Sequence, residues 1–217
     1  MDARLALAGL GLFVLLCPSA TLAQSMPVTA KERITDEIVQ NGKVIGGHTR
    51  EGVWFRNSAG SILDQWMTID GKAAVGQMAR ARLFDNEPGI HYELDYTEHQ
   101  AYTDSVPPPK TTITGSSRTR AQNALGQGSV QGIACTWFPT YQVGSDGVSR
   151  LAGRHCFSEE YELDLKEDAT FTYSIKGQTQ IQHMITEKYD IHVGQEPDPK
   201  LFDIKANFTV STPDPKQ

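Results

Sequence analysis

The residues with the clearest chemistry are Cys135 and Cys156, because two thiols in an oxidising compartment form a disulfide. Between them, Gly144-Ser145-Asp146-Gly147 predicts a tight turn, since glycine tolerates positive φ and an Asp side chain bonds its own backbone. An antiparallel hairpin centred on this turn pairs Cys135 with Cys156 and Trp137 with Arg154. Turn chemistry and cysteine spacing therefore predict one register and one structural disulfide. The alternative is a pair of buried free thiols.

The histidines offer weaker chemistry. His91 and Glu93 share a strand face and His99 follows, but no further ligand is placed, and simple alternation explains both as solvent-facing residues. His183 lies on an otherwise apolar strand face, where it is either a polar contact in a ligand cavity or a hydrogen-bonded core residue, and we favour the core residue. Ser145 and Ser158 lie in no nucleophile elbow. These patterns predict no metal, no cofactor and no catalytic centre.

The start of the chain predicts export. Arg4 precedes an apolar run from Leu5 to Leu16, and Thr21-Leu22-Ala23 has the small residues that a signal peptidase reads. The run is shorter than the roughly 20 apolar residues of a membrane span, so we expect residues 1–23 to be a cleaved signal peptide. Cys17 would leave with it.

Length and charge limit the remaining possibilities. Residues 24–217 are enough for one domain with a real core, and we expect no second domain. The formal net charge of −6 and the scattered basic residues argue against a nucleic-acid partner. No integral membrane span is expected.

The dominant hydrophobic period along this domain is two, which is typical of β-strands. Asn41-Gly42 predicts a two-residue hairpin turn. Residues 49–57 and 61–70 carry apolar side chains on both faces, which indicates strands covered on both sides. The Pro-, Thr- and Ser-rich segment 104–122 is expected to be a flexible loop. Further strands are predicted at 31–40, 43–45, 73–81, 89–96 and 100–103, the segment 73–81 only from its context.

The last third of the chain alternates almost without a break. Ile181, His183, Ile185, Tyr189, Ile191 and Val193 are expected to share one face of a strand of about thirteen residues. One helical turn is expected within 196–202, followed by a last strand whose inward residues run from Phe202 to Val210. About ten strands and few short helices predict a mostly β fold: a single strongly curved antiparallel sheet forming an open half-barrel.

Four motifs of the second half carry a resemblance: Leu125-Gly126, Val130-Gln131-Gly132-Ile133-Ala134, Phe157-Ser158-Glu159 and the segment from Glu196 to Ile204. In this order they resemble a group of uncharacterised bacterial exported proteins, which in turn resemble the LolA-type periplasmic lipoprotein-carrier superfamily. The resemblance implies an incomplete β-barrel around a hydrophobic cavity that receives acyl chains. The sequence departs from that superfamily in its cysteine pair and in having no confident candidate for the lid helices.

Together these observations predict a noncatalytic exported protein, periplasmic or extracellular, that binds a lipid, an acylated ligand or another apolar molecule in the concave face of its sheet. The alternative is a structural or partner-binding scaffold with a self-filled core and no small ligand. The residues expected to line the ligand site are Trp137, Phe171, Tyr173, Ile181, His183 and Ile185.

Overall fold

The computed structural model describes residues 25–74, 80–85, 90–103, 123–144, 147–175 and 177–211. The expected signal peptide at 1–23, the expected loop at 104–122, most of the 73–81 segment, and the turn residues Ser145 and Asp146 lie outside these ranges. Within the described ranges, the chain forms one large open sheet with one short α-helix and one 3-10 helix. The prediction of a mostly β fold built on a single sheet is confirmed.

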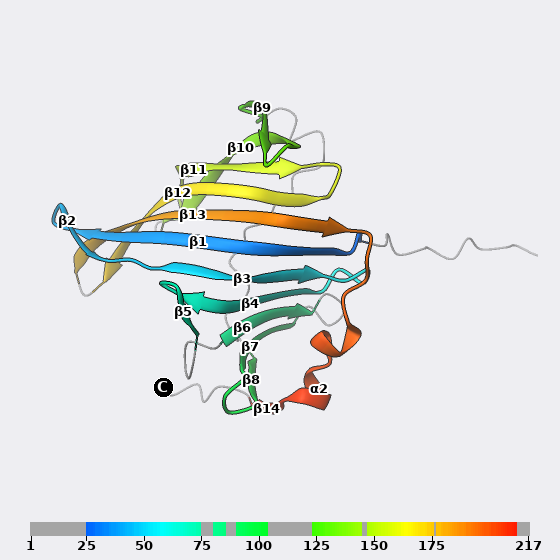
Figure 1. Cartoon of the computed structure of the whole chain (residues 1–217). Helices are drawn as coiled ribbons and strands as arrows, with labels where there is room; N and C mark the ends of the chain where they lie inside the picture. Colours follow the sequence, from blue (N-terminus) through cyan, green and yellow to red (C-terminus); the bar gives the residue numbers. More distant parts are fainter. Residues whose placement is uncertain are drawn as a thin grey trace, which may run out of the picture.

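Fourteen strands make up this sheet, in the order β14-β8-β7-β6-β4-β3-β1-β13-β12-β11-β10-β9, while β2 pairs with β1 and β5 with β4. The long strands β1 and β13 lie at its centre, with the N-terminal strands on one side and β9 to β12 on the other (Figure 1). The bounds are β1 Val28–Gln40, β2 Lys43–Gly46, β3 Thr49–Arg56, β4 Ile62–Ile69, β5 Lys72–Ala73, β6 Arg80–Asp85, β7 Ile90–Asp95, β8 Gln100–Thr103, β9 Gly126–Val130, β10 Ile133–Val143, β11 Ser149–Ser158, β12 Leu163–Ile175, β13 Gln178–Val193 and β14 Thr209–Ser211.

The sheet is curled, and Arg56 shows how tightly. This residue of β3 donates hydrogen bonds to the backbone carbonyls of Tyr161 and Glu162, at 2.7 and 2.6 Å. Those carbonyls belong to the turn between β11 and β12, although β1 and β13 separate β3 from β12 in the sheet. The face of Arg56 is therefore concave, and we call it the inner face. The opposite face is the outer face.

Each face carries its own apolar core. On the inner side, Val28 and Trp54 belong to a cluster that also contains Leu165. On the outer side of β4 to β8, Leu63, Leu83 and Leu94 form a second cluster with Ile204. The apolar residues on both faces of residues 49–70 are explained by these two cores, because β3 and β4 contribute to both.

The C-terminal segment covers the outer core and corrects one prediction. The expected strand from Phe202 to Val210 is wrong in its first part, because the chain forms η2 (Pro199–Phe202) and α2 (Ile204–Asn207) before β14. Asp203 caps α2, since its side chain accepts a hydrogen bond from the backbone N–H of Ala206. β14 then pairs with β8 in parallel, whereas the other pairs of described strands are antiparallel. These elements lie at the β8 end of the sheet (Figure 1).

The hairpin of β10 and β11 forms as predicted, but its register is shifted by two. Cys156 faces Trp137, not Cys135, and Arg154 faces Pro139. The register changes at a bulge between Thr140 and Tyr141. Neither the turn residues nor the cysteine spacing predicts this bulge. The disulfide between Cys135 and Cys156 nevertheless forms, with a Cα–Cα separation of 5.5 Å.

A second bulge overturns the expected single apolar face of β13. Asp190 has a φ of 52°, and the pairing of β13 with β1 shifts by one residue at this point. Ile181 and Ile185 face Val39 and Thr35 on the outer face, whereas Val193 faces the fully buried Val28 on the inner face. An inserted residue reverses which side of a sheet the following residues occupy, so unbroken alternation in sequence did not mean one face in the structure.

The disulfide gives the first prediction. Replacing both cysteines by alanine should lower the free energy of unfolding by about 3 kcal/mol, because the cross-link restricts a loop with a sequence separation of 21 in the unfolded chain. Urea unfolding of the oxidised wild type and the double variant, followed by tryptophan fluorescence, measures the difference. Equal midpoints and slopes would contradict the prediction.

Candidate functional site

The structure divides the six expected ligand-binding residues between the two faces. Phe171 and Tyr173 face Gln182 and Gln180 on the inner side, where their rings contact each other. The other four lie on the outer face: Trp137, Ile181, His183 and Ile185. No single surface therefore contains all six.

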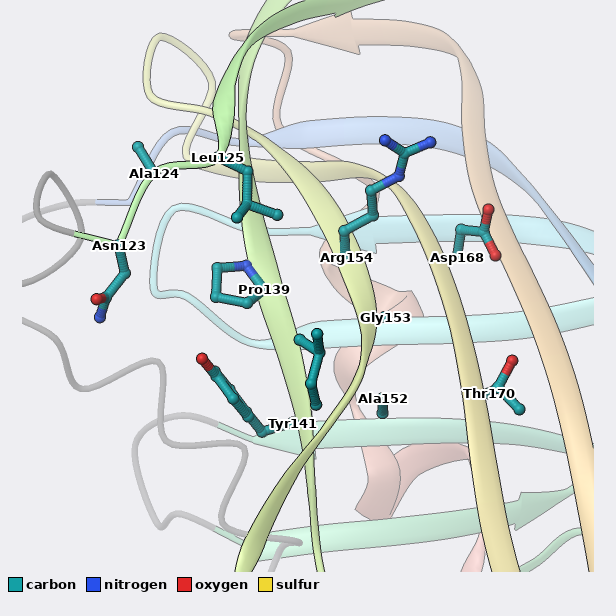
Figure 2. A pocket seen from close by; sticks show the side chains of 11 residues that line it. Asn123, Ala124, Leu125, Pro139, Tyr141, Ala152, Gly153, Arg154, Asp168 and Thr170 are labelled. Atoms are coloured by element: carbon teal, nitrogen blue, oxygen red, sulfur yellow. The ribbon is translucent and has the colours of Figure 1, made fainter.

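A pocket with a volume of about 660 Å³ lies on the outer face, over β10, β11 and β12. We call it the outer pocket. Figure 2 shows Leu125, Pro139 and Tyr141 along one side, with Arg154 and Asp168 across from them. Leu151 also lines it, and its 68% exposure shows that this apolar surface is open to solvent. None of the six expected residues lines the outer pocket.

Arg154 connects the outer pocket to a smaller pocket of about 310 Å³, which we call the second pocket. Its guanidinium lies over the Trp137 ring, 4.6 Å from the centroid, which is a cation–π contact. Lys166 and Glu187 line the second pocket as well. Charges of both signs therefore surround the Trp137 indole, and Trp137 is the one expected ligand-binding residue that lines a described pocket.

His183 is neither buried nor in the core, so the favoured interpretation of this residue is wrong. Its side chain is 45% exposed, and its Nε2 lies 2.8 Å from Oδ1 of Asp168. Asp168 lines both pockets. His183 therefore positions a pocket carboxylate from the neighbouring strand and does not itself line either pocket.

The inner face is crossed by buried charges. At its centre, Nζ of Lys188 on β13 lies 2.8 Å from Oε1 of Glu32 on β1, and the two side chains are only 10% and 7% exposed. Lys188 also lies over the Trp54 ring, 5.0 Å from the centroid. Burial of such a pair is tolerated because each charge is compensated by its partner.

Further along the same face, Arg82 of β6 donates a hydrogen bond of 2.7 Å to Asp64 of β4. Burial raises the pKa of Asp64 to about 6, helped by the nearby negative charge of Glu32 and opposed by Arg82 and Lys188. Arg82 also lies over the Trp66 ring, 5.4 Å from the centroid. The carboxyl of Asp64 is therefore expected to hold its proton to a higher pH than an ordinary aspartate.

On the other side of Lys188, Thr140 joins β10 to the next two strands. Its hydroxyl donates to Oε1 of Glu167 at 3.1 Å and lies 3.1 Å from Nδ1 of His155. Burial raises the pKa of Glu167, although the Thr140 hydrogen bond and the nearby charges of His155 and Lys188 oppose this effect. We call the full set the ionic belt: His155, Glu167, Lys188, Glu32, Asp64 and Arg82.

The ionic belt was missed by sequence reasoning, which predicted no buried ion pair. Its members come from six different strands, so no local spacing unites them. The one local signal is the regular alternation of Glu32 with the apolar Ala30 and Ile34, both of which are buried beside it. A charge within an apolar row of a long strand indicates a buried partner.

Two negative findings hold for the residues that the structure describes. They contain no group of three or more His, Cys, Asp or Glu side chains that could hold a metal ion. None of their helices is long and apolar enough to cross a membrane.

These features define a class of protein: an open, curled β half-barrel with an ion-paired inner face and, on its outer face, a pocket lined by both apolar and polar side chains. No protein-family model matches the chain, and no curated protein matches it.

Several solved structures are similar to most of this chain at low sequence identity. A LolA superfamily protein from Nitrosomonas europaea is 10% identical, with 83% of this chain and 91% of that chain covered and a TM-score of 0.36. A DUF1329 family protein from Desulfovibrio piger is 11% identical, with coverages of 84% and 92% and a TM-score of 0.23. A putative outer membrane lipoprotein-sorting protein domain from Vibrio parahaemolyticus is 7% identical, with coverages of 84% and 91% and a TM-score of 0.25. At these TM-scores the likeness assigns no function.

The Glu32–Lys188 pair gives the second prediction. Glu32→Gln or Lys188→Met alone should lower the free energy of unfolding by about 3 kcal/mol, because each leaves an uncompensated buried charge. The double variant should lose less than the two single losses combined. Urea unfolding of all four proteins forms the double-mutant cycle, and strict additivity would show that the pair is not coupled.

The third prediction concerns Asp64 and pH. Because its folded pKa lies above its ordinary value of 3.8, Asp64 favours the folded state most below about pH 4 and progressively less as pH rises through about 6. The stability of the wild type should therefore fall relative to Asp64→Asn as pH rises from about 4 to about 7. Thermal unfolding of both proteins across this pH range measures the difference in stability. Parallel curves of stability against pH would contradict the prediction.

Proposed function

We propose that this chain is a noncatalytic exported protein that binds an apolar, lipid-like ligand, and that the outer pocket is the binding site. The observation that carries the proposal is the outer pocket itself, with Leu151 and Tyr141 open to solvent at 68% and 54% exposure. Its volume of about 660 Å³ falls within the usual range of small-molecule sites. Apolar side chains gathered around a hollow favour an apolar ligand, because its binding removes both surfaces from water.

The pocket chemistry favours an amphiphile. An apolar chain would lie along Leu125, Pro139 and Tyr141, while the polar end of the ligand would lie toward Arg154 and Asp168 on the opposite side. Thr170 adds a hydroxyl on the same side. This division between an apolar wall and a polar wall matches a molecule with one long apolar part and one polar group.

The proposal places the ligand outside the concave face that the sequence favoured. The described inner face carries the ionic belt, and the charged groups of Glu32, Lys188 and Asp64 offer an apolar chain no favourable partner. Export is supported by the disulfide, since such bonds persist in oxidising compartments.

A scaffold without a small ligand is the second candidate, and the ionic belt favours it. Buried ion pairs such as Glu32–Lys188 fill the inner face with the chain's own side chains. In that case the curled sheet serves as a support for protein contacts, and the outer pocket carries solvent only.

The fourth prediction separates these candidates. The mature protein should bind a fluorescent long-chain fatty acid, and Leu151→Glu should weaken binding at least about tenfold, because it places a carboxylate against the apolar chain. Val44→Glu is the matched control, since Val44 is a strand residue of similar exposure, 62%, that does not line the outer pocket. Fluorescence titration gives the three dissociation constants.

Both substituted side chains are exposed, so both variants should fold, which circular dichroism verifies. Equal binding by Leu151→Glu and Val44→Glu would remove the outer pocket as the site. If the wild type binds no probe and protein purified from its own cells carries no extractable lipid, the scaffold replaces the carrier.

A further inference from the structure

The two edges of the open sheet differ in how they are protected. One edge is β14, which has only three residues. The other is β9, which has five residues and pairs only with β10 in the part of the chain that the structure describes. From Leu125 to Val130 there is no charged residue and no proline. Natural edge strands are normally shortened, charged or broken by proline to prevent pairing with another chain, and β9 has none of these protections.

Glycines leave the β9 backbone accessible. Gly126 and Gly128 pair with Trp137 and Cys135 of β10. A Cβ at Gly128 would overlap the Trp137 indole, so glycine allows this ring to lie directly against the backbone of β9. The strand therefore offers a backbone edge beside a flat aromatic surface, with no β9 side chains on that face between Leu125 and Val130.

A hollow lies at each end of β9. The outer pocket includes Asn123, Ala124 and Leu125 at its start, and the second pocket includes Ser129, Val130 and Gln131 at its end. Side chains of an added strand point alternately to the two faces, so two residues four positions apart lie on the same face. Two such residues could therefore enter the two hollows. Ladders of backbone N–H and C=O groups are complementary to an extended peptide backbone and not to a membrane or a packed helix.

We propose that β9 is a docking strand to which an extended segment of a partner protein adds as a further β-strand. The partner segment presents apolar side chains at alternate positions to the hollows at both ends of β9. It carries little net charge, because the charged residues that line the second pocket balance Arg154 and Lys166 against Asp168 and Glu187. Backbone hydrogen bonds supply the contact along β9, and the hollows select the side chains.

The test uses a short fluorescein-labelled peptide of alternating valine and threonine and the same peptide with alternate backbone amides methylated. Methylation removes hydrogen-bond donors without changing the side chains, so it should weaken binding to the mature protein by about tenfold or more. The double variant Gln127→Lys/Ser129→Lys should weaken binding by a similar factor. It places on β9 the charged side chains by which natural edge strands prevent pairing with another chain. Val210→Lys, on the opposite edge, should have no effect. Fluorescence anisotropy measures the four dissociation constants, those of the wild type with each peptide and those of the two variants with the unmethylated peptide.

Hydrogen exchange locates the contact: binding of the unmethylated peptide should slow exchange of amides within residues 125–131. Equal binding of both peptides, protection elsewhere, or no binding overturns the proposal. A dimer of the free protein with β9 protected also overturns it, because a second copy then occupies the edge. The double lysine variant should still bind the fatty-acid probe, since neither residue lines the outer pocket, so failure of the two proposals is distinguishable.

Discussion

The buried ion pair between Glu32 and Lys188 is the interaction on which the arrangement of this sheet depends. It joins β1 to β13, the two central strands, at the point where the N-terminal and C-terminal halves of the sheet meet. A charge on the concave face of either strand would be unfavourable without its partner. The pair therefore favours the observed register of β1 and β13, and the other strands pair outward from these two.

The curl of the sheet separates two kinds of surface. The inner face closes on itself, as the bonds from Arg56 to the carbonyls of Tyr161 and Glu162 show, and its charges pair with one another. The outer face is covered at the β8 end by α2, where Ile204 joins the apolar core. At the β9 end it carries the outer pocket, with Leu151 and Tyr141 open to solvent. Binding is therefore proposed where the described residues leave apolar surface exposed and one strand edge unpaired.

Much of the fold followed from local chemistry. Asn41 and Gly42 both adopt positive φ, 52° and 72°, as the predicted hairpin turn requires. The alternation of β3 and β4 indicated burial on both faces, and the two cores account for it. The candidate site was predicted less well, because only Trp137 among the six expected residues lines a described pocket.

The sequence by itself determined the strands, the mostly β class and the pair of cysteines, because these depend on period-two alternation, turn residues and residue type. Tertiary structure alone decided which face each side chain occupies. The bulge at Asp190 turned Ile181 and Ile185 outward, and the shifted register placed Trp137 opposite Cys156. Tertiary structure also brought the residues of the ionic belt together from six strands. Bulges and long-range ion pairs arise from contacts between segments distant in sequence, so no local pattern carries them.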